Sequence, residues 1–99
     1  MRVIAKSTLR AFWNEPGHRD AEEPLLAWHK EAETAKWSSP ADVKRQFGSA
    51  SILQRGRVVF NIAGNKYRLV VAIRYDLGIA FVRFVGTHAE YDDIDAQEV

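Results

Sequence analysis

The spacing of hydrophobic residues divides the chain into two halves with different periods. Up to about residue 47, apolar side chains recur every three or four positions, which is the spacing of an amphipathic helix. After Gly48 they alternate with other residues, which is the period of a β-strand. The sequence therefore predicts helices first and a sheet after them.

Two helices are predicted before residue 37. Leu9, Phe12 and Trp13 form an apolar stripe on a helix over about residues 8–14, with Ser7 as its N-cap. A second helix is predicted over about residues 20–36, and it carries an apolar stripe of its own. The members of that stripe are Leu25, Trp28, His29 and Ala32.

A short third helix is predicted over residues 41–47. Pro40 suits the first position of a helix. Proline has no backbone N–H, and an N–H at this position would have no partner within the helix. Asp42 follows Ser39 at the spacing of a capping box. We therefore expect Ser39 to cap this helix.

Three strands are predicted over residues 57–62, 66–74 and 79–85, with turns at 63–65 and 76–78. Helices followed by an antiparallel meander indicate a single α+β domain over residues 1–99, with N-terminal helices packed on one face of a small antiparallel sheet. In the middle strand, Arg68 and Arg74 point away from that face. We expect the second face to be open and to form a shallow, basic platform.

Charge is distributed unevenly along the chain, although the formal net charge is only +1. Residues 44–89 contain eight basic side chains and one acidic one, whereas residues 90–99 contain five acidic side chains and no basic one. A surface with the charge of the middle block attracts polyanions. The alternative interpretation is that these lysines and arginines only solvate strand edges.

Several function classes are excluded by what the sequence lacks. There is no cysteine, and the phosphate-binding, dinucleotide-binding, zinc-protease and serine-hydrolase motifs are missing. The three histidines, His18, His29 and His88, have no ligand-like spacing, so we predict no metal and no cofactor. No apolar run approaches the ~20 residues of a membrane span, and no signal peptide is evident, which favours a cytoplasmic protein.

Three side chains are candidates for chemistry. His88 follows the end of the last strand, and Tyr91 and two carboxylates lie near it in the sequence, so His88 and Tyr91 are able to carry out general acid–base catalysis. The same spacing fits a helix cap with an exposed histidine equally well. Arg68, on the central strand, can hold a phosphate and stabilise a pentavalent transition state. Its structural alternative is a salt bridge to an acid of the tail.

The other two histidines have simpler interpretations. His29 lies on the apolar stripe of the second helix, where we expect a partly buried histidine with a satisfied hydrogen bond. His18 follows Pro16 and Gly17 in a loop, where we expect it to be exposed.

Two motifs in residues 57–92 resemble a known family. FNIAGNKYRLVVA begins at Phe60, and FVRFVGTHAEYD begins at Phe81. Together they resemble the HigB toxins of bacterial type II toxin–antitoxin systems, which belong to the RelE-like group of messenger-RNA interferases. In those toxins an F-N-x-x-G-N-x-x-R-x-V-x-A stretch and a terminal T-H-x-x-Y-D occur together at this separation.

The resemblance implies a fold, an activity and partners. The fold is two or three helices on a small antiparallel sheet, and the activity is metal-independent endonucleolytic cleavage of mRNA, commonly on the ribosome. Arg68 matches the arginine at the scissile phosphate, and His88 and Tyr91 match the acid–base region. A HigA-like antitoxin with a helix-turn-helix is the implied protein partner. The residues predicted to bind RNA are Arg55, Arg57, Asn61, Asn65, Lys66 and Arg83.

A non-catalytic function is the alternative. The same fold serves the ParE branch, which poisons DNA gyrase, and a basic sheet can also serve a simple RNA-binding domain. Catalysis requires His88 or Tyr91 close to Arg68, whereas binding does not. Which residue acts as the base and which as the acid is left open by the sequence.

Overall fold

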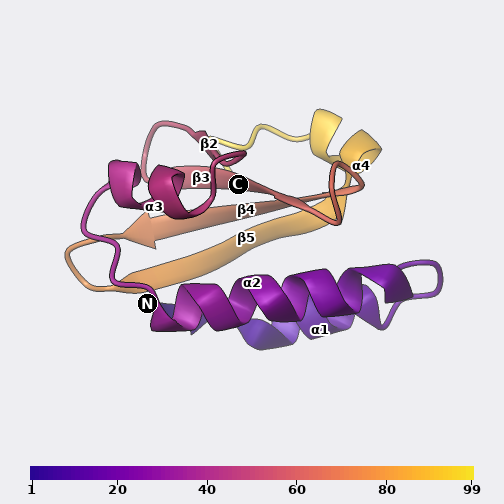
Figure 1. The fold of residues 1–99 in the computed structure, drawn as a ribbon. Helices are drawn as coiled ribbons and strands as arrows, with labels where there is room; N and C mark the ends of the chain where they lie inside the picture. Colours follow the sequence, from indigo (N-terminus) through magenta and orange to yellow (C-terminus); the bar gives the residue numbers. More distant parts are fainter.

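The computed structural model describes residues 1–99 and contains four helices and five strands (Figure 1). The helices are α1 (Lys6–Trp13), α2 (Glu22–Thr34), α3 (Pro40–Gln46) and α4 (His88–Asp92), and a 3₁₀ turn (Arg19–Ala21) precedes α2. The strands are β1 (Arg2–Ile4), β2 (Ser51–Ile52), β3 (Arg57–Ile62), β4 (Tyr67–Arg74) and β5 (Ile79–Thr87).

All five strands form one sheet in the order β1-β5-β4-β3-β2. The predicted meander β3-β4-β5 is antiparallel, and β2 continues it. The N-terminal strand β1 instead runs parallel to β5, which makes the sheet mixed. The predicted α+β class is confirmed.

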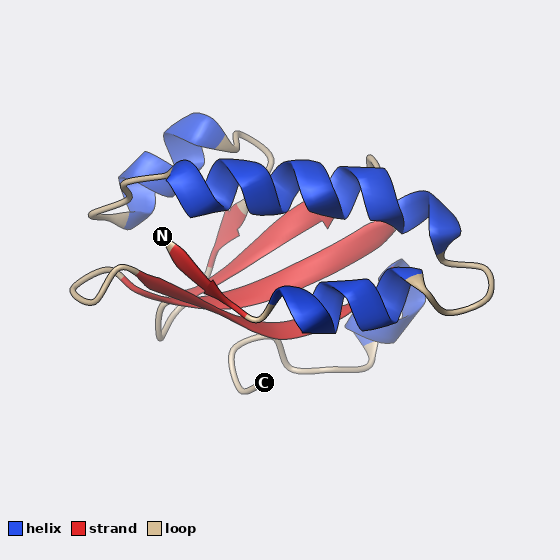
Figure 2. Ribbon diagram, turned by 90° about the horizontal axis from the view of Figure 1, so that it is seen from below, coloured by secondary structure: helices blue, strands red, loops and turns tan.

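The main core lies between the sheet and the helices α1, α2 and α3 (Figure 2). Leu25 and Trp28 of α2 are buried, as their stripe predicted, and the Trp28 ring meets the edge of the Phe60 ring of β3 at 5.3 Å. Every second residue of β4, from Tyr67 to Ile73, enters this core. The alternation of the strand therefore fixes the direction of Arg68, which points to the opposite face.

The second sheet face is partly covered, which corrects the prediction of an open platform. The chain turns back after α4, and the C-terminal segment (residues 93–99) lies on the side of the sheet away from α2 (Figure 2). Ala96 is buried there against Val59 and Val70, together with Ile94 and Val99. The open face was inferred because the predicted helices cover only one face, and burial of these C-terminal apolar side chains covers part of the other.

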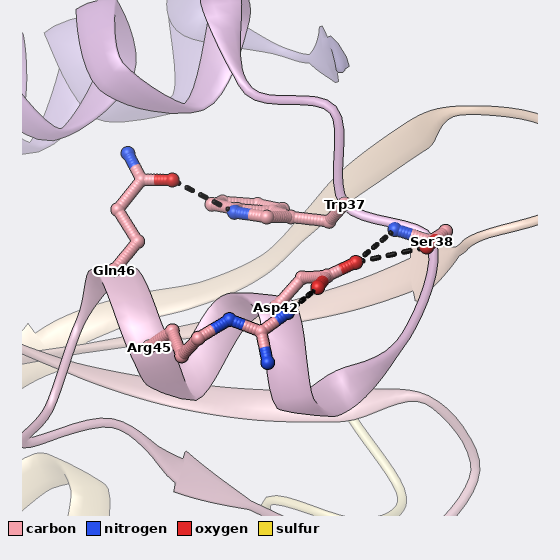
Figure 3. A network of polar contacts seen from close by, with 5 residues as sticks. All are labelled: Trp37, Ser38, Asp42, Arg45 and Gln46. Carbon is pink, nitrogen blue, oxygen red and sulfur yellow. Dashed lines mark hydrogen bonds and ion pairs between the residues drawn. The ribbon is translucent and has the colours of Figure 1, made fainter.

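One predicted helix cap is wrong, and the other is confirmed in its position but not in its side-chain bond. The N-cap of α1 is Ala5 rather than Ser7, which lies inside the helix. Ser39 is the N-cap of α3, as predicted, but its side chain makes no capping bond. Figure 3 shows that Asp42 instead accepts hydrogen bonds from the N–H (2.9 Å) and the hydroxyl (2.8 Å) of Ser38, which lowers the pKa of Asp42. The Asp42 carboxylate thus binds the residue before the N-cap, which spacing alone could not distinguish.

The same view shows how α3 is joined to the segment that precedes it. The indole N–H of Trp37 donates a hydrogen bond of 2.9 Å to the side chain of Gln46 (Figure 3). Trp37 is buried beside Phe47 and Phe60, so this bond satisfies a donor within the core. None of the helices combines the length and the hydrophobicity that crossing a membrane requires.

Candidate active site

The candidate site lies at one end of the sheet, where four segments meet (Figure 1). These segments are the β3–β4 turn, the end of β5, the short helix α4 and the loop between α1 and α2. The end of β5 lies beside the beginning of β4, because the two strands are antiparallel. This topology brings Arg68 of the first motif and His88 of the second, twenty positions apart in the sequence, to the same end of the sheet.

Arg68 lies on β4, opposite Asn61 of β3 and Gly86 of β5. Its guanidinium donates to the carbonyls of Asn65 (3.1 Å) and Tyr67 (3.4 Å), and the residue is half-buried. No carboxylate forms an ion pair with it, so the predicted alternative of a salt bridge to the tail is wrong. Arg68 therefore keeps its charge and several donors for an anion.

Helix α4 begins with a complete capping box. The Thr87 hydroxyl accepts from the Glu90 N–H (3.1 Å), and the Glu90 carboxylate accepts from the Thr87 N–H (2.8 Å). The bond from the Thr87 backbone holds the pKa of Glu90 below its usual value. Two orphan backbone donors are thereby satisfied, so the five-residue helix has a fixed start directly beside Arg68.

The two acid–base candidates lie three residues apart on this helix. His88 is exposed, and its Nδ1 lies 3.2 Å from a carboxylate oxygen of Asp92. Tyr91 is half-buried and packs against the cluster of Val59 and Val70 on the second sheet face. Arg68 points to that same face, so Arg68 and Tyr91 share one side of the sheet.

Asp20 is a member of this region that the sequence did not single out. It accepts a hydrogen bond of 2.5 Å from the Tyr67 hydroxyl and another from the Lys66 ammonium. The bond to Lys66, followed by that to Tyr67, lowers the pKa of Asp20, and the bond from Asp20 raises the pKa of Lys66. Asp20 thus anchors the start of β4 to the segment before α2. No local sequence signal links positions so far apart.

His18 is half-buried, which corrects the prediction that it is exposed. Its ring stacks on Phe12 with centroids 4.2 Å apart and meets the Tyr67 ring edge-on at 5.9 Å. Its Nδ1 lies 3.0 Å from a Glu15 carboxylate oxygen. The loop after Gly17 folds back over the end of the sheet, where aromatic packing retains the histidine.

The predicted RNA-binding residues lie in three different settings. Asn65 and Lys66 are at the candidate site, in the β3–β4 turn, but Lys66 is bound to Asp20. Arg55 and Arg57 lie toward the other end of β3, about 13 Å from the level of Asn61 at the usual rise per residue. The C-terminal segment binds both arginines, through Glu98 to Arg55 (2.9 Å) and through the Val99 main-chain oxygen to Arg57 (2.6 Å).

The last two predicted RNA contacts are dispersed. The Asn61 side chain donates to the Ser49 carbonyl at 3.2 Å. Arg83 is exposed on β5, with its guanidinium 5.4 Å above the Phe81 ring. It has no ion-pair partner and is therefore available to a phosphate.

The chemistry open to this region is that of a cation beside two proton-transfer groups. An arginine without a carboxylate partner can stabilise an oxyanion, and histidine and tyrosine can donate or accept a proton. No group of three or more His, Asp or Glu side chains is arranged to hold a metal ion.

Comparison with known proteins places these residues in a family. Residues 21–94, about three quarters of the chain, match the family model HigB_toxin, described as the RelE-like toxic component of a toxin–antitoxin system. The match includes β3, β4, β5 and α4, and so all three candidate catalytic residues. No curated protein matches the chain.

Proposed function

Because the chain belongs to the HigB family of RelE-like toxins, the toxic components of toxin–antitoxin systems, we propose that it is an endoribonuclease that cleaves mRNA. The observation that carries the proposal is the guanidinium of Arg68, which has no carboxylate partner and lies beside the helix of His88 and Tyr91. The guanidinium bonds only to main-chain carbonyls, so its charge is not neutralised by another side chain and remains available to a phosphate. The reaction takes place in the cytoplasm, on mRNA held by the ribosome.

The reaction is an internal transfer of the phosphodiester bond. A base removes the proton of a ribose 2′-hydroxyl, and the 2′-oxygen forms a bond to the adjacent phosphorus. Arg68 stabilises the additional negative charge of the pentavalent transition state. The bond to the 5′-oxygen then breaks, and an acid protonates that oxygen. The products are a 2′,3′-cyclic phosphate and a 5′-hydroxyl, and His88 and Tyr91 supply the base and the acid.

The protein partner is an antitoxin, as for other members of a toxin–antitoxin system. We expect a HigA-like DNA-binding protein that neutralises the toxin by masking the basic sheet face or by blocking access to the ribosome. Arg68 and Arg83, which lack acidic partners, are the charges that an acidic segment of such an antitoxin would neutralise.

Expression in a bacterial host tests the proposal. The chain is induced with and without the reading frame adjacent to its gene, and the ends of cellular mRNA are mapped. The proposal predicts growth arrest with new 5′-hydroxyl ends inside coding regions, and rescue by the neighbouring frame. Growth arrest with intact mRNA and inhibited gyrase would support the ParE-like alternative instead.

A further inference from the structure

An open cavity of about 520 Å³ lies at the end of the sheet opposite to Arg68. It is formed where the loop before β3 approaches the end of β4, and the start of α3 closes one side. Its volume lies within the range of sites that bind small molecules. The cleavage chemistry described above uses none of its residues.

Three arginines line the cavity and give it a positive charge. These are Arg55, Arg57 and Arg74, and the only acidic residue among the lining side chains is Asp76, which is bound to Arg74 through two hydrogen bonds of 2.9 and 3.1 Å. Arg55 pairs with Glu98, but both side chains are more than half exposed. Exposed pairs of this kind are weak, so an incoming anion can replace the carboxylate of Glu98.

Two buried donors belong to residues that line the cavity and have no hydrogen-bond partner. They are the Nε–H of Arg57 and the hydroxyl of Tyr75. A guanidinium can only donate hydrogen bonds, so the group that would satisfy Arg57 must be an acceptor. Both atoms are closed off from solvent, so a ligand in the open cavity would bind the accessible guanidinium nitrogens of the lining arginines, which also require acceptor oxygens.

The backbone between the first two arginines is fixed by close packing. Gly56 has a φ of +72°, and a Cβ at this position would lie 2.7 Å from the Ile73 carbonyl oxygen. The Gly56 carbonyl in turn accepts a hydrogen bond of 2.8 Å from the Ile73 N–H. The loop is therefore held against β4, so the two arginines that flank Gly56 have fixed backbone positions before any ligand binds.

The remaining wall of the cavity is apolar. Pro40, Leu53 and Ile73 contribute to it, and Ile52 on the edge strand β2 is 39 % exposed. An inorganic anion alone would leave this wall in contact with water. A planar base attached to the phosphate would cover it and add hydrophobic contact.

We propose that this cavity binds the phosphate group of a nucleotide through Arg57 and Arg74, with the base against the apolar wall. The phosphate replaces the Val99 main-chain oxygen at Arg57 and binds Arg74 beside Asp76. The phosphate belongs either to a free mononucleotide or to the backbone of a single strand that also reaches Arg68, and the second source rests on the proposed function. Both sources present the same group to the arginines.

An NMR titration of the full chain with adenosine 5′-monophosphate tests this site. We expect the largest amide shifts at Gly56, Arg57 and residues 73–76, and small shifts at residues 86–91. Adenosine, which lacks the phosphate, should bind at least tenfold more weakly. Equal shifts with adenosine, or shifts spread over all basic residues, would overturn the proposal.

Variants provide the second part of the test. Arg57→Gln and Arg74→Gln should each weaken binding of the monophosphate about tenfold, the effect of one charge-assisted hydrogen bond. Arg10→Gln is the matched control, because Arg10 is exposed on α1 and makes no ion pair. If both cavity variants bound the monophosphate as tightly as the parent, no such site would exist.

A six-nucleotide deoxyribonucleotide strand, which lacks the attacking 2′-hydroxyl, distinguishes the two sources. If the strand displaces the monophosphate and loses affinity in Arg57→Gln, the cavity is part of the path of the strand. If the monophosphate stays bound beside the strand, the cavity takes a free nucleotide, and either result supports a phosphate site. Arg68→Ala should abolish RNA cleavage while retaining monophosphate binding, so the cavity and the cleavage reaction can fail separately.

Discussion

Arg68 of β4 and Gly86 of β5 occupy opposed positions on the sheet face that points away from α2. The space that a side chain at Gly86 would fill is taken by the ring of Phe84, whose Cζ would lie 2.5 Å from a Cβ there. A Glu90 carboxylate oxygen would lie 3.1 Å from the same Cβ. The missing side chain at Gly86 thus allows Phe84 and α4 to lie close to the arginine.

Gly86→Ala should therefore reduce both stability and activity. The added methyl forces the Phe84 ring or Glu90 to move, and overpacking of this kind costs about 1–3 kcal/mol in the free energy of unfolding. Chemical denaturation measures this cost. Gly48→Ala is the control, because a Cβ at Gly48 meets nothing within 4 Å. Equal stability of the two variants would show that the close approach at Gly86 has no energetic consequence.

Asp20→Asn should make stability less dependent on pH in acid. The folded-state pKa of Asp20 lies below its usual 3.8, because its carboxylate accepts hydrogen bonds from Lys66 and Tyr67. Its contribution is present above the unfolded pKa and is lost as pH falls through the folded pKa. The free energy of unfolding, measured between about pH 6 and about pH 2.5, should fall more steeply for the parent than for the variant.

Asp93→Asn provides the comparison for that experiment, since Asp93 is exposed and its side chain makes no hydrogen bond or ion pair. It should retain the acid dependence of the parent. If Asp20→Asn and Asp93→Asn gave the same curve, the anchor between Asp20 and β4 would not contribute to stability.

Removal of residues 93–99 should increase the affinity for single strands while lowering stability. The deletion exposes Val59 and Val70, and it frees Arg55 and Arg57 from Glu98 and the Val99 main chain. With two more cations available, the dependence of log K on log salt should steepen by about 1.4, since each phosphate contact on a single strand contributes about 0.7. Fluorescence anisotropy with a labelled deoxyribonucleotide strand measures the affinity and its salt dependence, and chemical denaturation measures the stability.

The single substitution Glu98→Gln separates the effect of lost charge from that of exposing the apolar residues beneath the segment. It breaks only the exposed pair with Arg55, so stability should change by less than about 1 kcal/mol. If the deletion left affinity and salt dependence unchanged, the C-terminal segment would not compete with RNA for these arginines.

His88→Ala and Tyr91→Phe should each slow cleavage and alter its pH profile. A residue that transfers a proton in the transition state contributes typically about 100-fold to 10,000-fold. The arm of the pH–rate profile that belongs to the removed group should disappear. Ala89→Ser, an exposed change between the two on α4, should leave rate and profile unchanged. A slow variant with the profile of the parent would assign that residue to structure rather than to proton transfer.

The sequence predicted the parts of this structure that depend on local pattern. The bounds of β3 follow from its alternation, and the burial of Leu25 and Trp28 follows from the stripe of α2. The sequence did not predict the bulge of β5 opposite Val70 and Val71. In a regular strand, Phe81 and Phe84 would point to opposite faces, but the extra residue of the bulge lets both reach the second face. A bulge depends on pairing with another strand, so the alternation within β5 cannot reveal it.

The candidate site shows the same division. The two motifs identified Arg68, His88 and Tyr91, and antiparallel pairing brings their segments together. The contacts of Asp20 and His18 with Tyr67 could not be predicted because they span about fifty residues of sequence. The sequence also did not predict that the C-terminal segment packs over Val59 and Val70. Five of the last ten residues are acidic, and this charge drew attention away from the three apolar residues that make the contact, Ile94, Ala96 and Val99.

The most direct test of the central claim is cleavage of ribosome-bound mRNA by the purified chain, with the parent compared with Arg68→Ala and Arg68→Lys. The account predicts fragments ending in a 2′,3′-cyclic phosphate, a loss of turnover of about 100-fold to 1000-fold in Arg68→Ala with unchanged ribosome binding, and partial activity in Arg68→Lys. Full activity of folded Arg68→Ala, or no cleavage by the parent at any protein concentration, would contradict it.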